Sequence, residues 1–428
     1  MKIEEFREEN GATLVVATLP GALSFSAFLG VRTGSRDDPA GREGIAHLLE
    51  HLAFKGTARR PTFRDVAVEL DRVGAEFNAF TGREWLAFYV RGGSAAASTA
   101  LDVLVDMYTG SLVSEETVAR EKKVVIEELR LNENDGRLRA DDLMHQAMFA
   151  GTGLANPVGG TVQAVEAVDA ASVVAHMARH FTGPGTVLGL AGDVTPALVR
   201  QARRLLRAVP AAGTAGTAAA REPTGPARAG ATAPAAAILP MDAPHVHYVL
   251  SFPGWAATDD NRYAVGLLHT ILGGGMLSRL FCALREERGL SYYVGADHAA
   301  YRDRGSFNLR AGVRPERLAE AVAVTVEQLT DILHKGITAR ELDRAISYAR
   351  GRLELGLGDP RGALLFLLRR ACTDGRWEAP EEVVARTRAV SADAVMEALR
   401  ACLSAPPVLC CAGPLDRADD ALAELSAL

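Results

Sequence analysis

The stretch GIAHLLEHLAFKGT, residues 44–57, holds two histidines, His47 and His51, four positions apart, with Glu50 directly before the second. Apolar residues recur between them, which predicts a helix. Side chains at positions i and i+4 of a helix lie on the same side, so the two imidazoles can share one metal ion. Zinc suits imidazole ligands, and a catalytic zinc keeps one position open for water. Glu50 lies toward the same face, where it can accept a proton from the activated water.

The order of these residues, H-x-x-E-H, inverts the commoner H-E-x-x-H motif of metalloproteases. The alternative is an amphipathic helix that happens to be rich in histidine. Two histidines alone are also an incomplete site, because a zinc site needs at least three protein ligands. The stretch therefore predicts a metal site only if the chain supplies a third ligand.

A second stretch, AREKKVVIEELRL at residues 119–131, offers candidates for that ligand. Glu121 and Glu128 are seven residues apart, so they share a helix face, with Val124 and Val125 roughly between them, whereas Glu127 is rotated by about 100° from its neighbour. A face with two carboxylates among valines is suited to a metal. A solvated Glu/Lys-rich helix is the commoner explanation of such a stretch, and spacing alone leaves both open.

Composition limits the classes of protein that this chain can belong to. The formal net charge is -6 over 428 residues, which gives no electrostatic case for nucleic acid or an anionic membrane. No apolar run approaches the roughly 20 residues that a bilayer requires, and the charged start MKIEEFREENGATLVV does not resemble a signal peptide. The five cysteines all follow residue 281, which argues against a disulfide framework. We therefore expect a cytoplasmic protein.

Residues 211–237 are almost all Ala, Gly, Thr and Pro, so they cannot bury enough apolar surface to offset the entropy of ordering. This segment predicts an exposed linker between two domains, residues 1–210 and 238–428.

The two halves repeat one layout. Each begins with strand-like alternation, TLVVATLP and SFSAFLGVRTG in the first and HYVLSFPGW in the second. A helical stretch, further strands, long helical runs and a closing apolar strand, TVLGLAGDV or PPVLCCAGPL, follow in each. The pattern predicts an α+β fold with two homologous α/β-sandwich domains, in which helices pack on a mostly antiparallel sheet.

The stretch LGVRTGSRDDPAGREGIAHLLEHLAFKGT, residues 29–57, resembles along its whole length the signature of the inverzincin zinc metallopeptidases, which include pitrilysin, insulysin and the mitochondrial processing peptidase. The family's third ligand and a supporting glutamate fall on Glu128 and Glu121. The resemblance implies one Zn²⁺ per chain held by His47, His51 and Glu128, with Glu50 as the general base and Glu121 orienting the ligands from behind.

The resemblance extends over nearly all of the chain. NAFTGREWLAFYV, from Asn78, is similar to the family's edge strand, which implies that Asn78, Ala79 and Phe80 bind an extended peptide. GGGMLSRLFCALREERGLSYYV, residues 273–294, resembles the segment whose arginine and tyrosine face the substrate, here Arg285 and Tyr292. Gly82 and Leu52 depart from the usual serine and methionine, but neither is a ligand.

The implied function is that of a zinc endopeptidase that cleaves extended or unfolded peptides, with Tyr292 and Arg285 acting on the substrate. Half-size members of the family dimerise, so we expect a homodimer, or a heterodimer with a related chain. Two alternatives remain, a dedicated protease that removes a leader peptide from one precursor and a non-catalytic subunit of a processing peptidase. His176 and His180 are also four apart, but no acid stands between them, so they are weak candidates for a second metal site.

Overall fold

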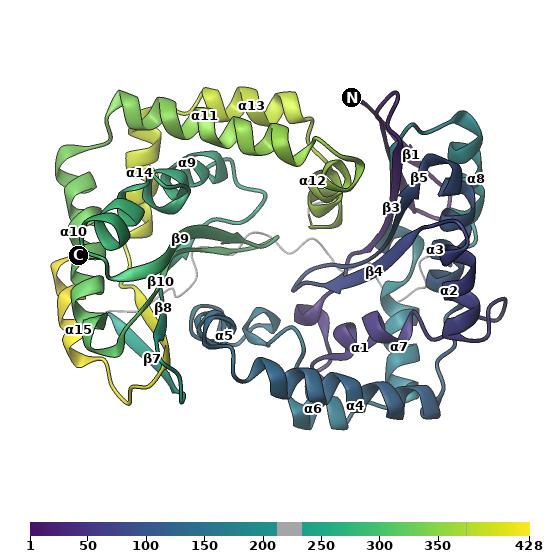
Figure 1. Ribbon diagram of the computed structural model, residues 1–428, viewed down its shortest axis with the longest axis horizontal. Coiled ribbons are helices and arrows are strands. Elements are labelled where there is room, and N and C mark those ends of the chain that lie inside the picture. The colour runs from purple at the N-terminus through teal and green to yellow at the C-terminus, as the bar shows by residue number, and fades with distance from the viewer. Residues whose placement is uncertain (212–232, 374) are drawn as a thin grey trace. The chain divides into compact units, whose positions relative to one another are not determined.

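The computed structural model describes residues 1–211, 233–373 and 375–428, which form two compact units (Figure 1). The described part of the first unit falls within residues 1–129, 156–211 and 354–379, and that of the second within 130–155, 233–353 and 380–428. Each unit contains one sheet with helices packed on it.

The sheet of the first unit has the strand order β1-β2-β6-β3-β5-β4. β2 and β6 are parallel, and the other neighbours are antiparallel. The strands are β1(Lys2–Arg7), β2(Thr13–Thr18), β3(Ser24–Val31), β4(Glu76–Thr81), β5(Leu86–Gly93) and β6(Thr186–Gly192).

The sheet of the second unit has the order β7-β11-β8-β10-β9, in which only β7 and β11 are parallel. Without β1, the first sheet has the same order and the same single parallel pair. The two units therefore share one topology, which confirms the predicted duplication of an α+β fold. The strands are β7(Ala235–Pro240), β8(Val246–Gly254), β9(Ser291–Ala300), β10(Gly305–Val313) and β11(Val408–Gly413).

The helices that cover the first sheet or extend from it have amphipathic sequences, with their buried residues spaced by three or four positions. The helices in the first half of the chain are α1(Ile45–Leu52), α2(Phe63–Asp71), α3(Ala97–Gly110), α4(Glu115–Asn132), α5(Gly136–Met148), α6(Val162–Glu166), α7(Ala170–His180) and α8(Pro196–Leu206). The helices in the second half are α9(Arg262–Gly273), the π-helical turn η5(Phe281–Glu287), α10(Leu318–Lys335), α11(Ala339–Gly356), α12(Pro360–Thr373), α13(Pro380–Arg388), α14(Ala392–Cys402) and α15(Asp419–Glu424). Among the described residues, no helix is both long and apolar enough to cross a bilayer.

Most of the predicted linker, residues 211–237, cannot be compared with the structure, but its last residues form part of a strand. Residues 212–232 lie outside the described part of the chain. Ala235, Ala236 and Ala237 belong to strand β7 and pair with β11. Small side chains do not prevent a strand from forming when a neighbouring strand supplies the backbone hydrogen bonds.

The expected domains, residues 1–210 and 238–428, also differ from the compact units, because each unit takes one helix from the other half of the sequence. Helix α12 packs on β2, β3 and β6, and α5 packs on β7, β8 and β11. A Cβ at Gly189 of β6 would lie 2.8 Å from Leu364 and Leu368 of α12, so glycine lets the helix approach closely. Each sheet has two apolar faces. Helices from the same half of the sequence cover one face, and the helix from the other half covers the second.

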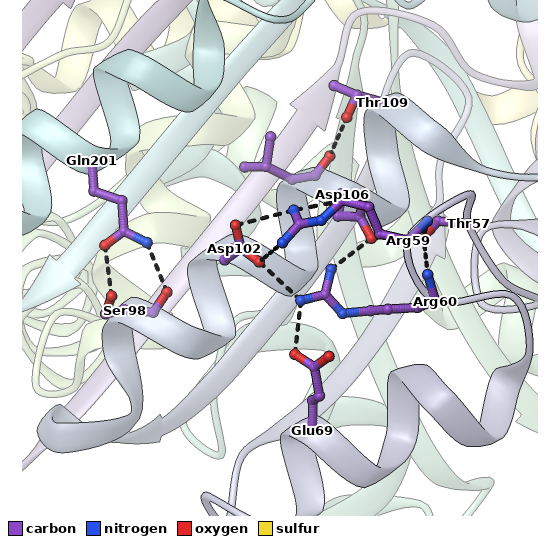
Figure 2. Close-up of polar contacts among 10 residues, drawn as sticks. Thr57, Arg59, Arg60, Glu69, Ser98, Asp102, Asp106, Thr109 and Gln201 are labelled. Carbon is purple, nitrogen blue, oxygen red and sulfur yellow. Dashed lines mark hydrogen bonds and ion pairs between the residues drawn. The ribbon is translucent and has the colours of Figure 1, made fainter.

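The loop that follows α1 is held by a buried ion-pair cluster, shown in Figure 2. The Arg60 guanidinium donates to Asp106 at 2.6 Å, to Asp102 at 2.8 Å and to Glu69 at 2.7 Å. Burial lowers the pKa of Arg60, but the hydrogen bonds with these carboxylates outweigh it and raise the pKa above its usual value. The Thr57 hydroxyl also donates to Asp106, at 2.7 Å. The cluster therefore ties the loop after α1 to α2 and α3.

We predict that Arg60→Met destabilises the protein by about 3 kcal/mol, because the buried Asp106 carboxylate then keeps only the exposed Arg59, 3.8 Å away, as a cation. The matched control is Arg59→Met. The Arg59 side chain is 57% exposed, against 5% for Arg60, although it also pairs with Asp102. Its loss should cost less than about 1 kcal/mol. Urea unfolding of the two variants measures the difference, and equal losses would contradict the role given to Arg60.

We also predict that Leu368→Ala lowers the free energy of unfolding by about 3 kcal/mol, since this side chain of α12 is fully buried against the first sheet. Leu355→Ala, at a position that is 72% exposed, should cost less than about 0.5 kcal/mol. Trp85 and Trp377 pack against the same cluster, so tryptophan fluorescence during urea unfolding reports on it. A loss below 1 kcal/mol for Leu368→Ala would mean that α12 does not stabilise this face.

Candidate metal centre

Helices α1 and α4 bring two imidazoles and one carboxylate together. Glu128 Oε2 lies 3.7 Å from His47 Nε2 and 3.5 Å from His51 Nε2. One donor atom from each of these three residues lies within 4.8 Å of the others, and this is the one such group of three or more among the described residues. The sequence-predicted ligands thus meet, although they come from segments about 75 residues apart.

The arrangement fits a small tetrahedral ion. Donor atoms bound at roughly 2.0–2.2 Å in tetrahedral geometry lie about 3.3–3.6 Å apart. The two nitrogen–oxygen distances are close to that range. Burial, and next the neighbouring His47, hold the pKa of His51 below its usual value, so the imidazole is neutral, as a metal ligand must be. Two imidazoles and a carboxylate are a donor set that zinc accepts.

Glu121 lies behind these ligands on the same face of α4. Its Oε2 is 4.0 Å from His51 Nδ1 and 2.8 Å from the Lys55 ammonium, and its side chain is almost fully buried. Val125 is buried beside it, but Val124 is 49% exposed. The expectation that both valines lie between the two glutamates was therefore wrong for Val124. The inward stripe of α4 includes positions 121, 125 and 128, and Val124 is rotated out of it, while Glu127 is exposed.

Glu50 is held by the neighbouring edge strand. Thr81, the last residue of β4, donates its hydroxyl to Glu50 Oε2 at 2.6 Å. This contact fixes one carboxylate oxygen and leaves the other for chemistry. The sequence analysis did not single out Thr81 or Lys55. The sequence could have pointed to both residues, because Thr81 ends the stretch N-A-F-T and Lys55 lies in the stretch F-K-G-T, and both stretches belong to the motifs that were considered.

The start of α1 is fixed by a buried carboxylate and a glycine. Asp38 accepts the N–H groups of Gly44 at 2.7 Å and Ala46 at 3.1 Å, which caps the helix. Burial raises the pKa of Asp38 to about 7 in spite of these bonds. Gly44 has φ of +103°, and a Cβ there would lie 2.5 Å from the carbonyl oxygen of Gly159, so only glycine fits.

The loop before α1 is tied to the turn after β4. The N–H of Ser35 donates to Gly82 O at 3.1 Å, and Arg36 forms a buried ion pair with Glu84. A buried ion pair of this kind fixes geometry, since either partner alone would be an uncompensated charge. The helix that carries His47, Glu50 and His51 is therefore anchored before its first turn.

Among the described strands β4 pairs with β5 alone, so it lies at the edge of the first sheet. Asn78 is exposed, Ala79 is buried and Phe80 is half-buried. The N–H of Ala79 donates to the side-chain oxygen of Asn78 at 2.8 Å. A free edge of this type can accept a further strand through main-chain hydrogen bonds.

Arg285 and Tyr292 meet in the second unit. The Arg285 guanidinium donates to the carbonyl oxygen of Tyr292 at 2.9 Å and lies 5.0 Å from the centre of its ring. The Tyr292 side chain is 83% exposed, whereas its neighbour Tyr293 is half-buried and hydrogen-bonded to His247. Arg285 lies in η5, and π-helical turns are frequent at functional sites.

His176 and His180 stack with ring centres 4.4 Å apart, but they belong to no metal-type cluster among the described residues. His176 lies 3.3 Å from the Thr33 hydroxyl, and burial lowers its pKa to about 3. Burial and contact with a hydroxyl are the surroundings of a histidine that packs in the core.

Known proteins resemble this chain in sequence over nearly its full length. The family described as Insulinase (Peptidase family M16) matches residues 15–162, and the Peptidase M16 inactive domain matches residues 167–348. An uncharacterized zinc protease of Streptomyces coelicolor is 34% identical over 95% of this chain and 88% of its own length. The uncharacterized zinc protease YmxG of Bacillus subtilis is 27% identical over 92% of this chain and 94% of its own.

Solved structures have the same fold. A Pseudomonas fluorescens protein described as a peptidase M16 inactive domain has a TM-score of 0.85 at 20% identity, covering 97% of this chain and 99% of its own. A protease from Helicobacter pylori has a TM-score of 0.84 at 17% identity, over 96% and 99%. These structures show that the fold is shared, and the sequence matches support a general peptidase function. The chain belongs to the insulinase family of peptidases, family M16.

Proposed function

We propose that the protein is a zinc-dependent endopeptidase that cleaves extended or unfolded peptides. The observation that carries the proposal is the approach of donor atoms from His47, His51 and Glu128 to within 4.8 Å of one another, with Glu50 on the same helix. The names of the relatives describe zinc proteases, and the donor set here suits that ion.

His47, His51 and Glu128 would hold the ion, and Glu121 would orient His51. When bound, zinc supplies Lewis-acid chemistry, because it acidifies a water molecule and polarises a peptide carbonyl. Glu50 acts as the general base, since the Thr81 hydroxyl engages only one of its oxygens. The same carboxyl then passes the proton to the leaving amine. The Lys55 ammonium lies 2.8 Å from Glu121 Oε2 and supplies the positive charge that pairs with this buried carboxylate.

The peptide would add to the free edge of β4 at Asn78, Ala79 and Phe80 through main-chain hydrogen bonds. Docking there requires the Asn78 side chain to release the N–H of Ala79. Tyr292 offers an exposed phenol that can donate to a developing oxyanion, and Arg285 holds the backbone at that tyrosine. This mode reads the peptide main chain, which favours unfolded substrates. A dimer of two such chains stays a prediction that light scattering can measure.

The proposal predicts that Glu50→Gln abolishes peptide cleavage without loss of zinc. The amide keeps the size of the side chain and its contact with Thr81 but cannot accept a proton. Cleavage of a quenched fluorescent peptide library should fall at least 1,000-fold, by the usual scale of general-base catalysis, and both proteins should hold about one zinc per chain.

Two outcomes would change the assignment. Zinc in both proteins without cleavage by either would favour a maturation protease for one precursor or a partner-dependent subunit. Absence of zinc from the wild type after loading would contradict the metal centre itself.

A second variant tests the contact with the edge strand. Thr81→Val keeps the shape of the side chain and removes the hydroxyl that donates to Glu50. We expect kcat to fall about tenfold, the cost of about 1.4 kcal/mol of lost orientation, while KM changes less than twofold. Ser94→Ala, which removes a hydroxyl that donates to Ala22 elsewhere in the unit, is the matched control. An unchanged kcat for Thr81→Val would show that Glu50 needs no such support.

A further inference from the structure

A cavity of about 620 Å³ opens at one end of the second sheet, next to Arg285 and Tyr292. Four segments line it. They are the start of β8 with His245 and His247, η5 with Arg285, the start of β9 with Tyr292 and Tyr293, and the residue after β10, Arg314. Its volume is within the usual range of ligand sites, roughly 300–1,000 Å³.

The floor of the cavity is built from two rings in fixed positions. Tyr293 OH lies 2.8 Å from His247 Nδ1, and the two rings stack with centres 5.7 Å apart. A Cβ at Gly312 would lie 2.5 Å from the Tyr293 ring and 3.3 Å from His247 Nδ1, so this glycine leaves the space that the rings occupy. The Arg137 guanidinium covers the other side of Tyr293 at 4.6 Å. The Tyr293 and His247 rings are therefore held in place by their neighbours and form a defined wall of the cavity.

The charged side chains that line the cavity are cationic. Arg285 and Arg314 border it, and none of its described lining residues is an aspartate or a glutamate. The acids nearby act from outside: Glu286 lies 3.6 Å from Arg285, and Glu316 lies 3.4 Å from Arg314. Asp135 accepts the N–H groups of Arg137 and Leu138 at the start of α5, so its charge is already engaged.

Arg314 has the capacity to bind a ligand. Its side chain is 63% exposed, and its ion pair with Glu316 is between two exposed groups, which contributes little and is easily exchanged. A guanidinium binds carboxylate oxygens through two parallel hydrogen bonds. Burial lowers the pKa of His247, so near pH 7 the arginines carry the positive charge and the histidine and tyrosine act as neutral hydrogen-bonding groups.

We propose that this cavity is a carboxylate-recognition subsite, in which Arg314, with His245 and His247 beside it, binds an acidic side chain or the free C-terminus of the peptide substrate. The inference rests on the proposed peptidase function, since it names the class of peptide that the enzyme prefers. Tyr292, the proposed donor to the oxyanion, lines the same cavity, so a bound carboxylate belongs to a residue near the cleaved bond.

Kinetics test the proposal with pairs of quenched fluorescent peptides that are blocked at both ends and differ only in Glu against Gln at one position. The position is moved through the residues that flank the cleaved bond. We expect a preference for Glu of roughly tenfold in kcat/KM at one position, mainly through KM, the scale of one charge-assisted hydrogen-bonded pair. Arg314→Gln should reduce this ratio to less than twofold.

The matched control is Arg317→Gln, three residues away. Arg317 is outside the cavity lining and pairs with Glu320 on the surface, so the Glu/Gln ratio should be unchanged. A second pair of peptides without acidic residues compares a free C-terminus with an amide. A preference for the free carboxylate that is lost in Arg314→Gln assigns the subsite to the peptide end, and a preference for internal Glu assigns it to a side chain.

Binding is measured separately from turnover, by fluorescence anisotropy of the same labelled peptides on full-length Glu50→Gln protein. If cleavage fails but the acidic peptide binds about tenfold more tightly in an Arg314-dependent way, the carboxylate subsite stands and the proposed catalysis falls. Equal Kd and equal kcat/KM for Glu and Gln peptides, and for free and amidated ends, would overturn the subsite even if the protein is an active peptidase.

Discussion

Two imidazoles on α1 face two carboxylates on α4, and the function of the first unit depends on this contact. Four titratable groups in a largely buried place are costly unless each has a partner. The Lys55 ammonium pairs with Glu121, and the two imidazoles lie 3.7 Å and 3.5 Å from the Glu128 carboxylate. A divalent cation completes the set, because it offsets the negative charge that the glutamates bring together. The arrangement is thus better explained as a metal centre than as a solvated helix face.

The rest of the first unit holds α1 in place at both ends. Asp38 caps its first turn, the Arg36–Glu84 pair ties the preceding loop to the turn after β4, and the Arg60 cluster fixes the loop that follows (Figure 2). Catalytic groups must be held within a fraction of an ångström of their working geometry, and a helix anchored at both ends meets this condition. The same strand that offers a free edge for a peptide also ends in Thr81, which orients Glu50.

Sequence reasoning predicted the α+β duplication from local periodicity, and the spacing of His47 and His51 placed both on one helix face. Glu128 was assigned as the third ligand only through the resemblance to the metallopeptidase family, because the spacing in its own stretch also fits a solvated helix. Sequence reasoning did not predict the exchange of α5 and α12 between the units, since the apolar pattern of a helix does not indicate which sheet the helix covers. The first three residues of β7 were assigned to the linker because alanine has little strand preference, and the pairing of β7 with β11 is a long-range effect. Val124 was placed on the wrong side of α4 because the two valines are rotated by about 50° in opposite directions from the line through Glu121 and Glu128, and only the side with Val125 is buried. The cavity at Arg314 is lined by four separate segments of the chain, so no single sequence motif predicts it.

The most direct test of the central claim is anomalous diffraction at the zinc absorption edge from crystals of the zinc-loaded protein. The account predicts one strong peak between α1 and α4, at roughly 2.0–2.2 Å from His47 Nε2, His51 Nε2 and a Glu128 oxygen. A loaded crystal with no peak at that place, or with a peak held by other residues, would contradict the metal centre and the peptidase mechanism that depends on it.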